Sequence, residues 1–404
     1  MSYDFWKGVN VIEWGRSIAT AFNARMLADM GAHVVKVEPP TGDPARRMGP
    51  FPDNTPHPEK SGLFLALNTN KLGITLDPTC ETGRTVFVEL VKATDVLIFD
   101  ARPKDLARWR LAFGDLKKLN GSLIMVSITP FGSSGPYQDF KASDLTLFQM
   151  SGYARSMVRG ESDPSAKVPV RAQGEQIGMV GGLTATLATS MALLQRAATK
   201  QGTFVDVSLW EAMCMLNNGG YATTAFQQFA ATGSEEQAAN RGTVATLETN
   251  DGYVVVSPRE DDQWTRWIAL LGNPPWASDP RFANRQLRSK NWDELEPLLV
   301  EWTSRHSKEE VYHLAQGREI PSFPMNTVAD LFRSEQLRVR GAFTTIEHPV
   351  AGKLPHTTPP YRPGGQQPRP DEPAPRLGEH TEQVLAGIGI AKEEQLRLRA
   401  LGVI

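Results

Sequence analysis

The sequence predicts an α/β protein with a large domain built on a parallel sheet and a smaller α+β domain. Three observations carry this prediction. Short apolar segments alternate with amphipathic helical segments over the first 220 residues. After about residue 220 the pattern changes to a hairpin followed by polar helices, and residues 355–375 hold eight prolines in 21 positions.

The first βαβ unit is read from residues 9–38. Val9–Glu13 is a short apolar run typical of a buried strand, and residues 19–30 place apolar side chains on one face of a helix that Gly31 ends. A second strand follows over His33–Val37, which favours parallel pairing with the first. The same alternation predicts strands at 73–76, 95–99, 123–128 and 204–208, with helices at 81–93, 183–197 and 209–218.

The second half predicts three segments. Residues 244–248 and 252–257 form a hairpin around Asn250-Asp251-Gly252, with helices near 261–272, 291–304 and 307–316. We expect a large domain over 1–220, a small domain over 221–325 and a segment, 326–404, that returns to complete the large domain. In this last segment a helix spans 326–340, the proline-rich stretch is extended, and a closing helix begins at Thr381.

Composition narrows the function. The 404 residues carry 43 Lys+Arg against 45 Asp+Glu, so the surface is not basic enough to suggest nucleic acid as a partner. No uninterrupted apolar run of 18 residues and no signal peptide are evident, so we expect no membrane association. Cys80 and Cys214 form no disulfide framework and the seven histidines show no metal-ligand spacing. We therefore predict a cytoplasmic protein without a metal site.

Residue patterns alone leave the ligand open. Glu38 follows the second strand, where a ribose-binding acid would lie, but the first turn, Trp14-Gly15-Arg16-Ser17, lacks G-x-G-x-x-G. Dinucleotide binding is therefore not expected. Basic residues that follow several strands would suit a ligand with phosphates, although a solvated face explains them as well. They are Arg46, Arg47, Lys71, Arg102, Lys104, Arg108 and Lys141.

Several collinear segments resemble the class III CoA-transferases, the family of formyl-CoA and carnitine CoA-transferases. The matching segments are Gly8–Glu13, Leu27–Glu38, Gly42-Asp43-Pro44-Ala45-Arg46, Asn68-Thr69-Asn70-Lys71, Asp95–Ile98, Phe131-Gly132 with Gly135-Pro136-Tyr137, Asp279–Phe282 and Gly378–Thr381. The resemblance implies a Rossmann-like large domain, a small domain and two chains interlocked like links. It also implies a coenzyme A thioester as substrate and no bound cofactor.

The resemblance implies a reaction that needs a carboxylate nucleophile. In the family an aspartate attacks the acyl-CoA thioester to give an anhydride, and the CoA thiolate then gives an enzyme–CoA thioester. That aspartate lies in a segment often written G-E-Q-x-D-x-x-x-G-L. Here the segment reads Gly174-Glu175-Gln176-Ile177-Gly178, so Gly178 occupies the aspartate position.

Other positions implied to contact CoA are partly altered. Asp100 replaces an asparagine of the family, Arg16 replaces a polar residue, and Thr20-Ala21 replaces a Gly-Pro pair. Lys71, Arg108 and Lys141 match family positions. Arg16, Lys71, Asp100, Arg108 and Lys141 are thus the predicted CoA-binding residues.

Three hypotheses stay open. The chain is a non-catalytic subunit whose homologous partner supplies the aspartate, in an interlocked heterodimer or an α2β2 assembly, as the resemblance to the two-subunit benzylsuccinate CoA-transferase of anaerobic toluene degradation suggests. Alternatively, Glu175 is a displaced nucleophile of a self-sufficient transferase. Or the chain is a CoA-binding, isomerase-like protein, although racemases of this fold also use the aspartate that Gly178 replaces. Succinyl-CoA and benzylsuccinate are substrates by analogy, while Phe148, Met150, Tyr153 and Met179 are apolar candidates for a substrate cavity or the core.

Overall fold

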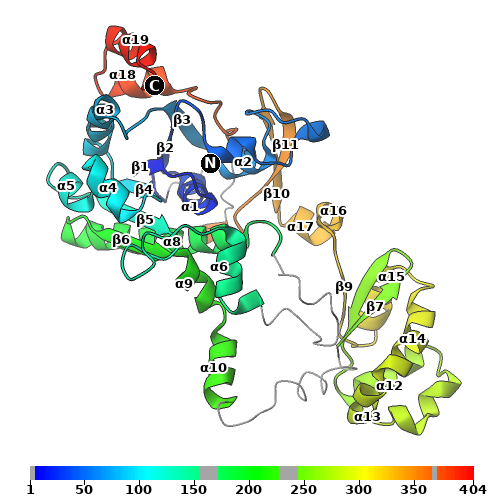
Figure 1. Ribbon diagram of the computed structural model, residues 1–404. Helices are drawn as coiled ribbons and strands as arrows, with labels where there is room; N and C mark the ends of the chain where they lie inside the picture. The colour runs from blue at the N-terminus through cyan, green and yellow to red at the C-terminus, as the bar shows by residue number, and fades with distance from the viewer. Residues whose placement is uncertain (1–4, 155–171, 228–243, 366–370) are drawn as a thin grey trace. The chain divides into compact units, whose positions relative to one another are not determined.

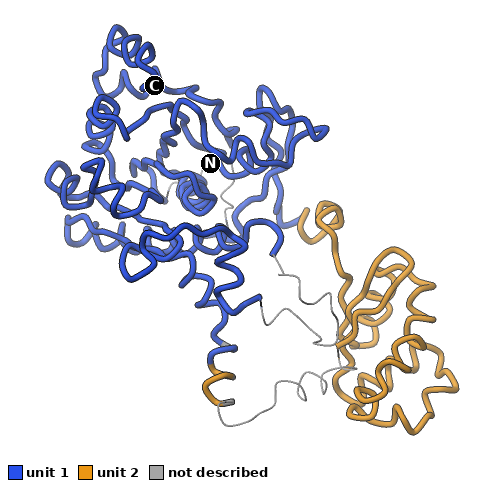
Figure 2. The backbone as a smooth tube through the Cα atoms, in the orientation of Figure 1, with its two compact units in different colours: residues 1–221, 339–404 blue, residues 222–338 orange. Residues whose placement is uncertain are grey.

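The computed structural model describes residues 5–154, 172–227, 244–365 and 371–404 (Figure 1). The chain divides into two compact units, Met1–Tyr221 with Val339–Ile404 and Ala222–Arg338 (Figure 2). The sequence places the second boundary after residue 325. The structure groups residues 326–338, with α16 (Val328–Arg333) and most of α17 (Glu335–Val339), with the second unit.

A six-stranded parallel sheet lies at the centre of the first unit, in the order β3-β2-β1-β4-β5-β6. Its strands are β1 (Asn10–Trp14), β2 (His33–Glu38), β3 (Lys71–Thr75), β4 (Val96–Phe99), β5 (Ile124–Thr129) and β6 (Phe204–Ser208). The chain reverses its direction of winding between β1 and β4, which opens a crevice at the carboxyl ends of these two strands. The predicted α/β class with a parallel sheet is confirmed.

Helices cover both faces of the sheet. One face carries α1 (Ile18–Asp29), α6 (Asp144–Met150), α8 (Gln176–Thr199) and α9 (Leu209–Met215), which bury a core with Val11, Val34 and Ile128. The opposite face carries α3 (Glu81–Lys92), α4 (Pro103–Trp109), α5 (Phe113–Lys117), α18 (Thr381–Gly387) and α19 (Lys392–Ala400) around Ile12, Phe87 and Phe99. Alternate residues of each buried strand therefore serve two separate cores.

α8 is the longest helix among the described residues and begins seven residues before the predicted start at 183. It has the length and apolar composition of a membrane span, yet 44% of its most apolar window is buried. It packs against α1, α9 and β5. These contacts place one side of α8 in the core of the first unit.

The chain returns to the first unit at its C-terminal end. β10 (Phe343–His348) and β11 (Gly352–Thr357) form an antiparallel hairpin, and α2 (Gly62–Leu67) packs in a small cluster beside it with Leu354. Residues 371–381 then follow the free edge of β3. His380 and Gly73 exchange two hydrogen bonds, the Gly73 N–H donating to His380 Nδ1 at 3.1 Å and the His380 N–H to Gly73 O at 2.9 Å. The Thr75 N–H donates to Thr381 Oγ1 at 2.9 Å.

The second unit has its own core. β7 (Ala245–Thr249) and β8 (Gly252–Val256) pair as the predicted hairpin, and β9 (Ser322–Pro324) adds to β8. α12 (Asp261–Leu270), α14 (Trp292–Thr303) and α15 (Lys308–Gln316) bury Trp267, Leu295 and Val311, and α13 (Arg285–Lys290) lies between the first two in sequence. α10 (Asn218–Gln227) spans the boundary between the two units.

Candidate functional site

The crevice between β1 and β4 is built by two short loops. β1 ends at Trp14, and Gly15-Arg16-Ser17 leads into α1, whose first turn is capped by the Ser17 hydroxyl. The loop after β4 places Asp100 against this turn, where Asp100 Oδ2 accepts the N–H groups of Arg16 at 2.8 Å and Ser17 at 2.7 Å. A carboxylate is stabilised at such a helix N-terminus because the unpaired N–H groups carry positive partial charge.

The charge of Asp100 is set by two opposing causes. Burial raises the pKa of this carboxyl, and the N–H groups of Arg16 and Ser17 lower it; the net shift is upward. Asp100 contacts the Arg16 segment through the Arg16 backbone, while the Arg16 side chain is exposed. The structure brings these two predicted residues together.

Gly178 lies in the first turn of α8, directly against the first turn of α1. A Cβ atom on Gly178 would come within 2.9 Å of both Cβ and Cγ2 of Ile18. Real Cβ atoms do not approach other atoms so closely, and Ile18 is β-branched, so its Cβ cannot rotate away. The place of a side chain at position 178 is thus filled by Ile18.

Two further glycines of α8 lie at close contacts with neighbouring helices. A Cβ on Gly182 would lie 2.9 Å from the carbonyl oxygen of Ala19, and one on Gly181 would lie 2.1 Å from Leu209 Cδ2. Gly178 and Gly182 let the backbones of α8 and α1 approach one another, while Gly181 makes room for Leu209 of α9. The sequence segment that held the predicted catalytic position is therefore also the contact face between two core helices.

Two carboxylates lie at the start of α8. Glu175 is half-buried and precedes the helix with φ = 56° and ψ = 48°, a left-handed conformation that is uncommon for glutamate. Asp144, the first residue of α6, accepts the N–H of Ile177 on Oδ1 at 3.0 Å. Asp144 was not predicted from the sequence. Ser143-Asp144 signals a helix start, but no local pattern places it beside a helix 33 residues later.

Lys71 lies inside the protein. Its ammonium donates to Glu13 Oε2 at 2.7 Å, Ala21 O at 2.8 Å and Asn68 Oδ1 at 2.9 Å. These bonds use all three of its protons, and the residue is 3% exposed. Burial lowers the pKa of Lys71 to about 8, against the opposing effect of the Glu13 carboxylate. The geometry gives Lys71 a structural role in joining β1, β3 and α1.

Glu13 connects Lys71 to a second buried cation. Lys36 Nζ lies 2.7 Å from Glu13 Oε1 and 2.8 Å from Asp43 Oδ2. Burial opposes ionisation of Glu13, but the two ammonium groups outweigh it and its pKa is lowered. Glu38, the position considered for ribose binding, is 1% exposed and accepts Arg46 Nε and Nη2 at 2.7 Å each. These acids belong to internal ion pairs.

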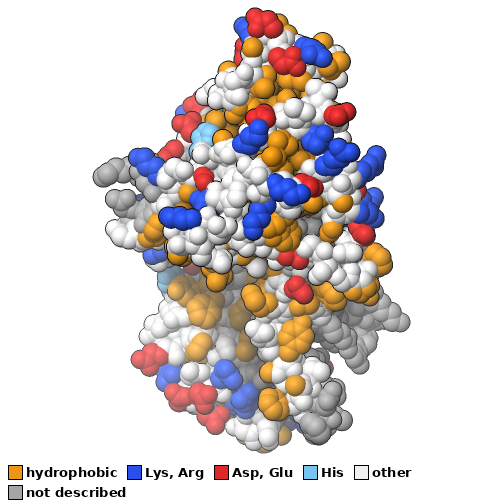
Figure 3. All heavy atoms as spheres, turned by 90° about the vertical axis from the view of Figure 1, so that its left-hand side faces the viewer, with side chains coloured by type: hydrophobic (Ala, Val, Ile, Leu, Met, Phe, Trp, Pro, Cys, Tyr) orange, Lys and Arg blue, Asp and Glu red, His pale blue; other side chains and the backbone are white. Residues whose placement is uncertain are grey.

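The other predicted cations lie on the surface of the first unit. Arg108 is in the last turn of α4, and Lys141 lies between β5 and α6; both side chains are exposed. The neighbour of Arg108, Trp109, packs on Trp14 with ring centroids 5.7 Å apart, which ties α4 to the end of β1. Figure 3, which shows the left-hand side of Figure 1, has Lys and Arg side chains spread among apolar ones over this unit.

The four apolar residues considered for a substrate cavity differ in burial. Phe148 is fully buried in the core, Tyr153 and Met179 are half-buried, and Met150 is 43% exposed. In the described part of the chain, no three His, Cys, Asp or Glu side chains are grouped so that they could hold a metal ion.

Comparison of the whole sequence with known protein families identifies the family of this chain. The family model of CoA-transferase family III matches residues 6–381, and the chain belongs to this family. CoA-transferases of this family act on CoA thioesters, so the chain belongs to a class of CoA-transferring enzymes.

Three known proteins show how close the similarity is. The chain is 30% identical over 395 residues to the BbsE subunit of succinyl-CoA:(R)-benzylsuccinate CoA-transferase from Thauera aromatica, covering 95% of this chain and 94% of the relative. It is 29% identical over 415 residues to the β subunit of succinyl-CoA–L-malate CoA-transferase from Chloroflexus aurantiacus, covering 98% and 97%. A CAIB/BAIF family protein from Brucella suis superposes with a TM-score of 0.83 at 29% identity, covering 95% and 98%.

Proposed function

We propose that this chain is the supporting subunit of a heteromeric class III CoA-transferase that moves CoA from an acyl-CoA, with succinyl-CoA the first candidate, to a free carboxylic acid. A homologous partner chain supplies the nucleophilic aspartate. The observation that carries the proposal is the contact between Gly178 and Ile18, since position 178 holds no side chain and a Cβ there would meet Ile18 at 2.9 Å.

The chemistry explains why this contact decides the matter. A carboxylate attacks the thioester carbonyl, the C–S bond breaks, and the acyl group is held as a mixed anhydride while CoA leaves as thiolate. The thiolate then attacks the carbonyl of the enzyme's carboxyl group in that anhydride, releasing the first acid and leaving an enzyme thioester. The acceptor carboxylate and the thiolate repeat the two steps in reverse order. Glycine has no side chain that can form either acyl intermediate.

The proposed CoA contacts in this chain are the exposed cations Arg16, Arg108 and Lys141, which follow β1, β4 and β5 along the chain. They suit the phosphates of CoA by charge. Asp100, bound to the N–H groups of Arg16 and Ser17, opposes an incoming phosphate there, which fits a half-site that retains the fold but binds CoA weakly. Lys71 is left out because Glu13, Ala21 and Asn68 already accept its protons.

The exposed surface of α8 is an argument for a partner chain. Leu183, Leu187, Met191 and Leu194 are 49–66% exposed and recur at helical spacing on the side of α8 away from α1. An apolar stripe of this length on a folded unit is typical of a protein interface. Relatives with subunit names, from Thauera aromatica and Chloroflexus aurantiacus, make a homologous chain the first candidate, interlocked with this one and assembled as an α2β2 complex. Benzylsuccinate is the first acceptor to test.

The experiment compares three samples: this chain, a homologue with aspartate at the aligned position, and the two co-expressed. The assay uses succinyl-CoA as donor and several dicarboxylates, including benzylsuccinate, as acceptors. We expect activity in the co-expressed sample. The rate from this chain alone should be lower by a factor on the order of 10⁴ or more. The partner's Asp→Asn variant should remove the activity. Full activity from this chain alone contradicts the proposal.

A self-sufficient enzyme is the alternative that this experiment would reveal. Glu175 and Asp144 both lie at the start of α8, so an active lone chain would have one of them as nucleophile. Glu175→Gln and Asp144→Asn, measured separately, identify which. Exchange of an α-proton of an acyl-CoA with deuterated water, without any acceptor acid, would instead identify an isomerase-like activity.

A further inference from the structure

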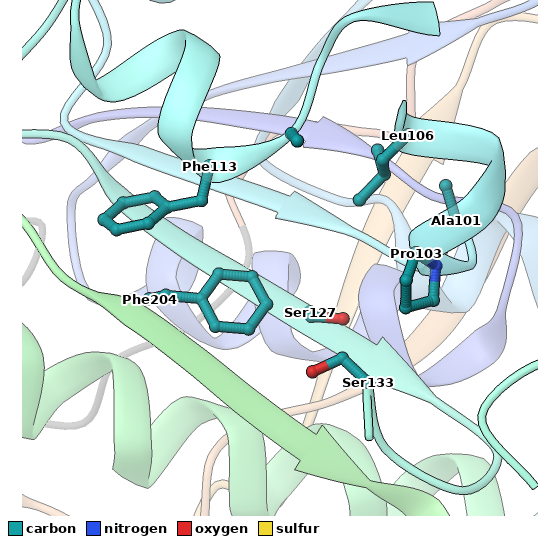
Figure 4. A pocket seen from close by; sticks show the side chains of 8 residues that line it. Ala101, Pro103, Leu106, Phe113, Ser127, Ser133 and Phe204 are labelled. Atoms are coloured by element: carbon teal, nitrogen blue, oxygen red, sulfur yellow. The ribbon is translucent and has the colours of Figure 1, made fainter. Parts of the chain in front are cut away.

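A pocket lies on the face of the sheet opposite to α1 and α8, at the carboxyl end of β5 (Figure 4). Its volume is about 260 Å³. α4, α5, β5, β6 and the loops after β4 and β5 contribute its lining residues, which are Ala101, Pro103, Leu106, Ala112, Phe113, Ser127, Ser133 and Phe204. Glu175, Gly178 and Asp144, at the start of α8, lie on the other side of the sheet and do not line this pocket.

The floor of the pocket holds a buried polar group. Ser127, in the middle of β5, is 1% exposed, and its hydroxyl is directed into the cavity (Figure 4). Ser127 Oγ forms no hydrogen bond with the residues that the structure describes, and it borders the open space of the pocket. This hydroxyl is therefore available to a hydrogen-bonding group of a molecule bound in the pocket.

The mouth of the pocket is fixed in place. Asp206, at the neighbouring position on β6, accepts the Ser133 N–H on both carboxylate oxygens at 3.0 Å. This bond holds the Gly132–Gly135 loop, with its two left-handed glycines, over the end of β5. The Ser133 hydroxyl lines the pocket above Ser127 and offers a second hydrogen-bonding group.

The remaining walls are apolar and aromatic. The rings of Phe113 and Phe204 lie 5.7 Å apart at 45°, and Leu106 and Pro103 face them across the cavity. No lining residue carries a charge. Engineered apolar cavities of about 150 Å³ bind benzene, so a volume of 260 Å³ accommodates one or two fused rings.

We propose that this pocket binds a neutral, flat aromatic molecule of one or two rings that carries a hydrogen-bonding group for Ser127. The aromatic faces of Phe113 and Phe204 contact the ring, and the two serine hydroxyls orient it. The site includes none of the proposed CoA contacts and no residue at the start of α8, although Arg108 lies on α4 with Pro103 and Leu106. It exists whether or not the chain is catalytic.

The test is a calorimetric titration of the full-length chain with indole, with ¹⁹F spectra of 5-fluoroindole as a second readout. We expect saturable binding with one site per chain. Ser127→Ala removes one hydrogen bond to the ligand and should weaken binding about fivefold. Ala112→Leu places a larger side chain into the cavity and should remove binding. Ala107→Leu, on the exposed side of α4, is its matched control and should bind like the wild type.

Four outcomes overturn the proposal. They are no saturable binding up to the solubility of indole, unchanged affinity in Ala112→Leu, unchanged affinity in Ser127→Ala, and loss of indole binding when CoA saturates the protein. The last would make the pocket part of the nucleotide site. Ser133→Leu fills the cavity from the loop on its other side, so it decides the question if Ala112→Leu does not fold.

Discussion

Ile18 and Gly178 set how closely the first turns of α1 and α8 approach. Replacing the glycine with aspartate restores the family's carboxylate but places a Cβ 2.9 Å from Ile18 Cβ and Cγ2. We expect Gly178→Asp to lower the free energy of unfolding by about 1–3 kcal/mol, the usual cost of overpacking. It should not create transferase activity in the lone chain.

Ile18→Gly tests the cause, because it removes both contacting atoms. In a double-mutant cycle followed by urea unfolding, we expect a coupling free energy of about 1–2 kcal/mol between the two positions. Gly114→Asp is the matched control: it also lies in the first turn of a helix, and its Cβ would meet nothing within 4 Å. Additive single-variant effects would contradict the proposed contact.

The same residues show what the sequence can and cannot reveal about the site. A departure from a local motif is visible in the text, so Gly178 and Asp100 could be singled out. The partners of those positions could not, because Ile18 and Gly178 meet only when two helices 160 residues apart pack together. The burial of a side chain could not be predicted either. Lys71 matches a family motif, yet its ammonium group already donates hydrogen bonds to Glu13, Ala21 and Asn68.

The hairpin of β10 and β11 joins α1 through buried charged and titratable groups. Arg25 of α1 donates to the carbonyl oxygens of Thr357 and, at 2.6 Å, Ala66. His356 of β11 is 6% exposed. Burial, with Arg25 and His348 nearby, lowers the pKa of His356 to about 4. Asp29 and Tyr361 complete the group: burial raises the pKa of Asp29 to about 6 and that of Tyr361 to about 12.

These groups predict a stability loss in acid that belongs to this hairpin. Between pH 6.5 and 4 the unfolded chain protonates His356 while the folded chain keeps it neutral, so the stabilisation is complete above pH 6.5 and lost as the pH falls toward 4. From pH 8 to pH 5 the wild type should lose up to about 2 kcal/mol more than His356→Gln in urea unfolding. Protonation of Asp29 raises the free energy of unfolding as the pH falls, but it does so equally in the wild type and in His356→Gln.

His33→Gln controls for the loss of an exposed histidine and should follow the wild type across this range. If His356→Gln showed the same pH dependence as the wild type, His356 would not be the group that titrates. The histidine on β10, His348, accepts the N–H groups of Val350 and Ala351 on Nδ1, which keeps that nitrogen unprotonated in the fold.

Elements were predictable where burial produces a regular pattern. The central strands are continuous apolar runs because both faces of the sheet are covered, and α3 has a clear apolar face. α2, α6 and the β10–β11 hairpin were missed because each is short or mixes polar and apolar residues. The predicted single helix over 326–340 is two helices, with Ser334 in an extended conformation between them.

At the scale of the whole molecule, a segment near the C-terminal end of the chain covers the edge of a sheet that begins near its N-terminal end. His380 accepts the N–H of Gly73 at the free edge of β3, across 307 residues. His380→Ala leaves this donor without its acceptor and should lower the free energy of unfolding by about 1–2 kcal/mol. His313→Ala, at an exposed position on α15, is the control for urea unfolding. Equal stability of the two variants would show that the return segment does not depend on this bond.

The long separation between β3 and the residues that cover its edge has a consequence for synthesis. A ribosome adds about 5–20 residues per second, so roughly 15–60 s pass between translation of β3 and of the residues that close it. During that interval the strand presents the N–H groups of Gly73 and Thr75 to whatever is near the ribosome, including a second nascent chain. A second subunit that is made nearby can therefore meet this chain while the edge of β3 is still uncovered.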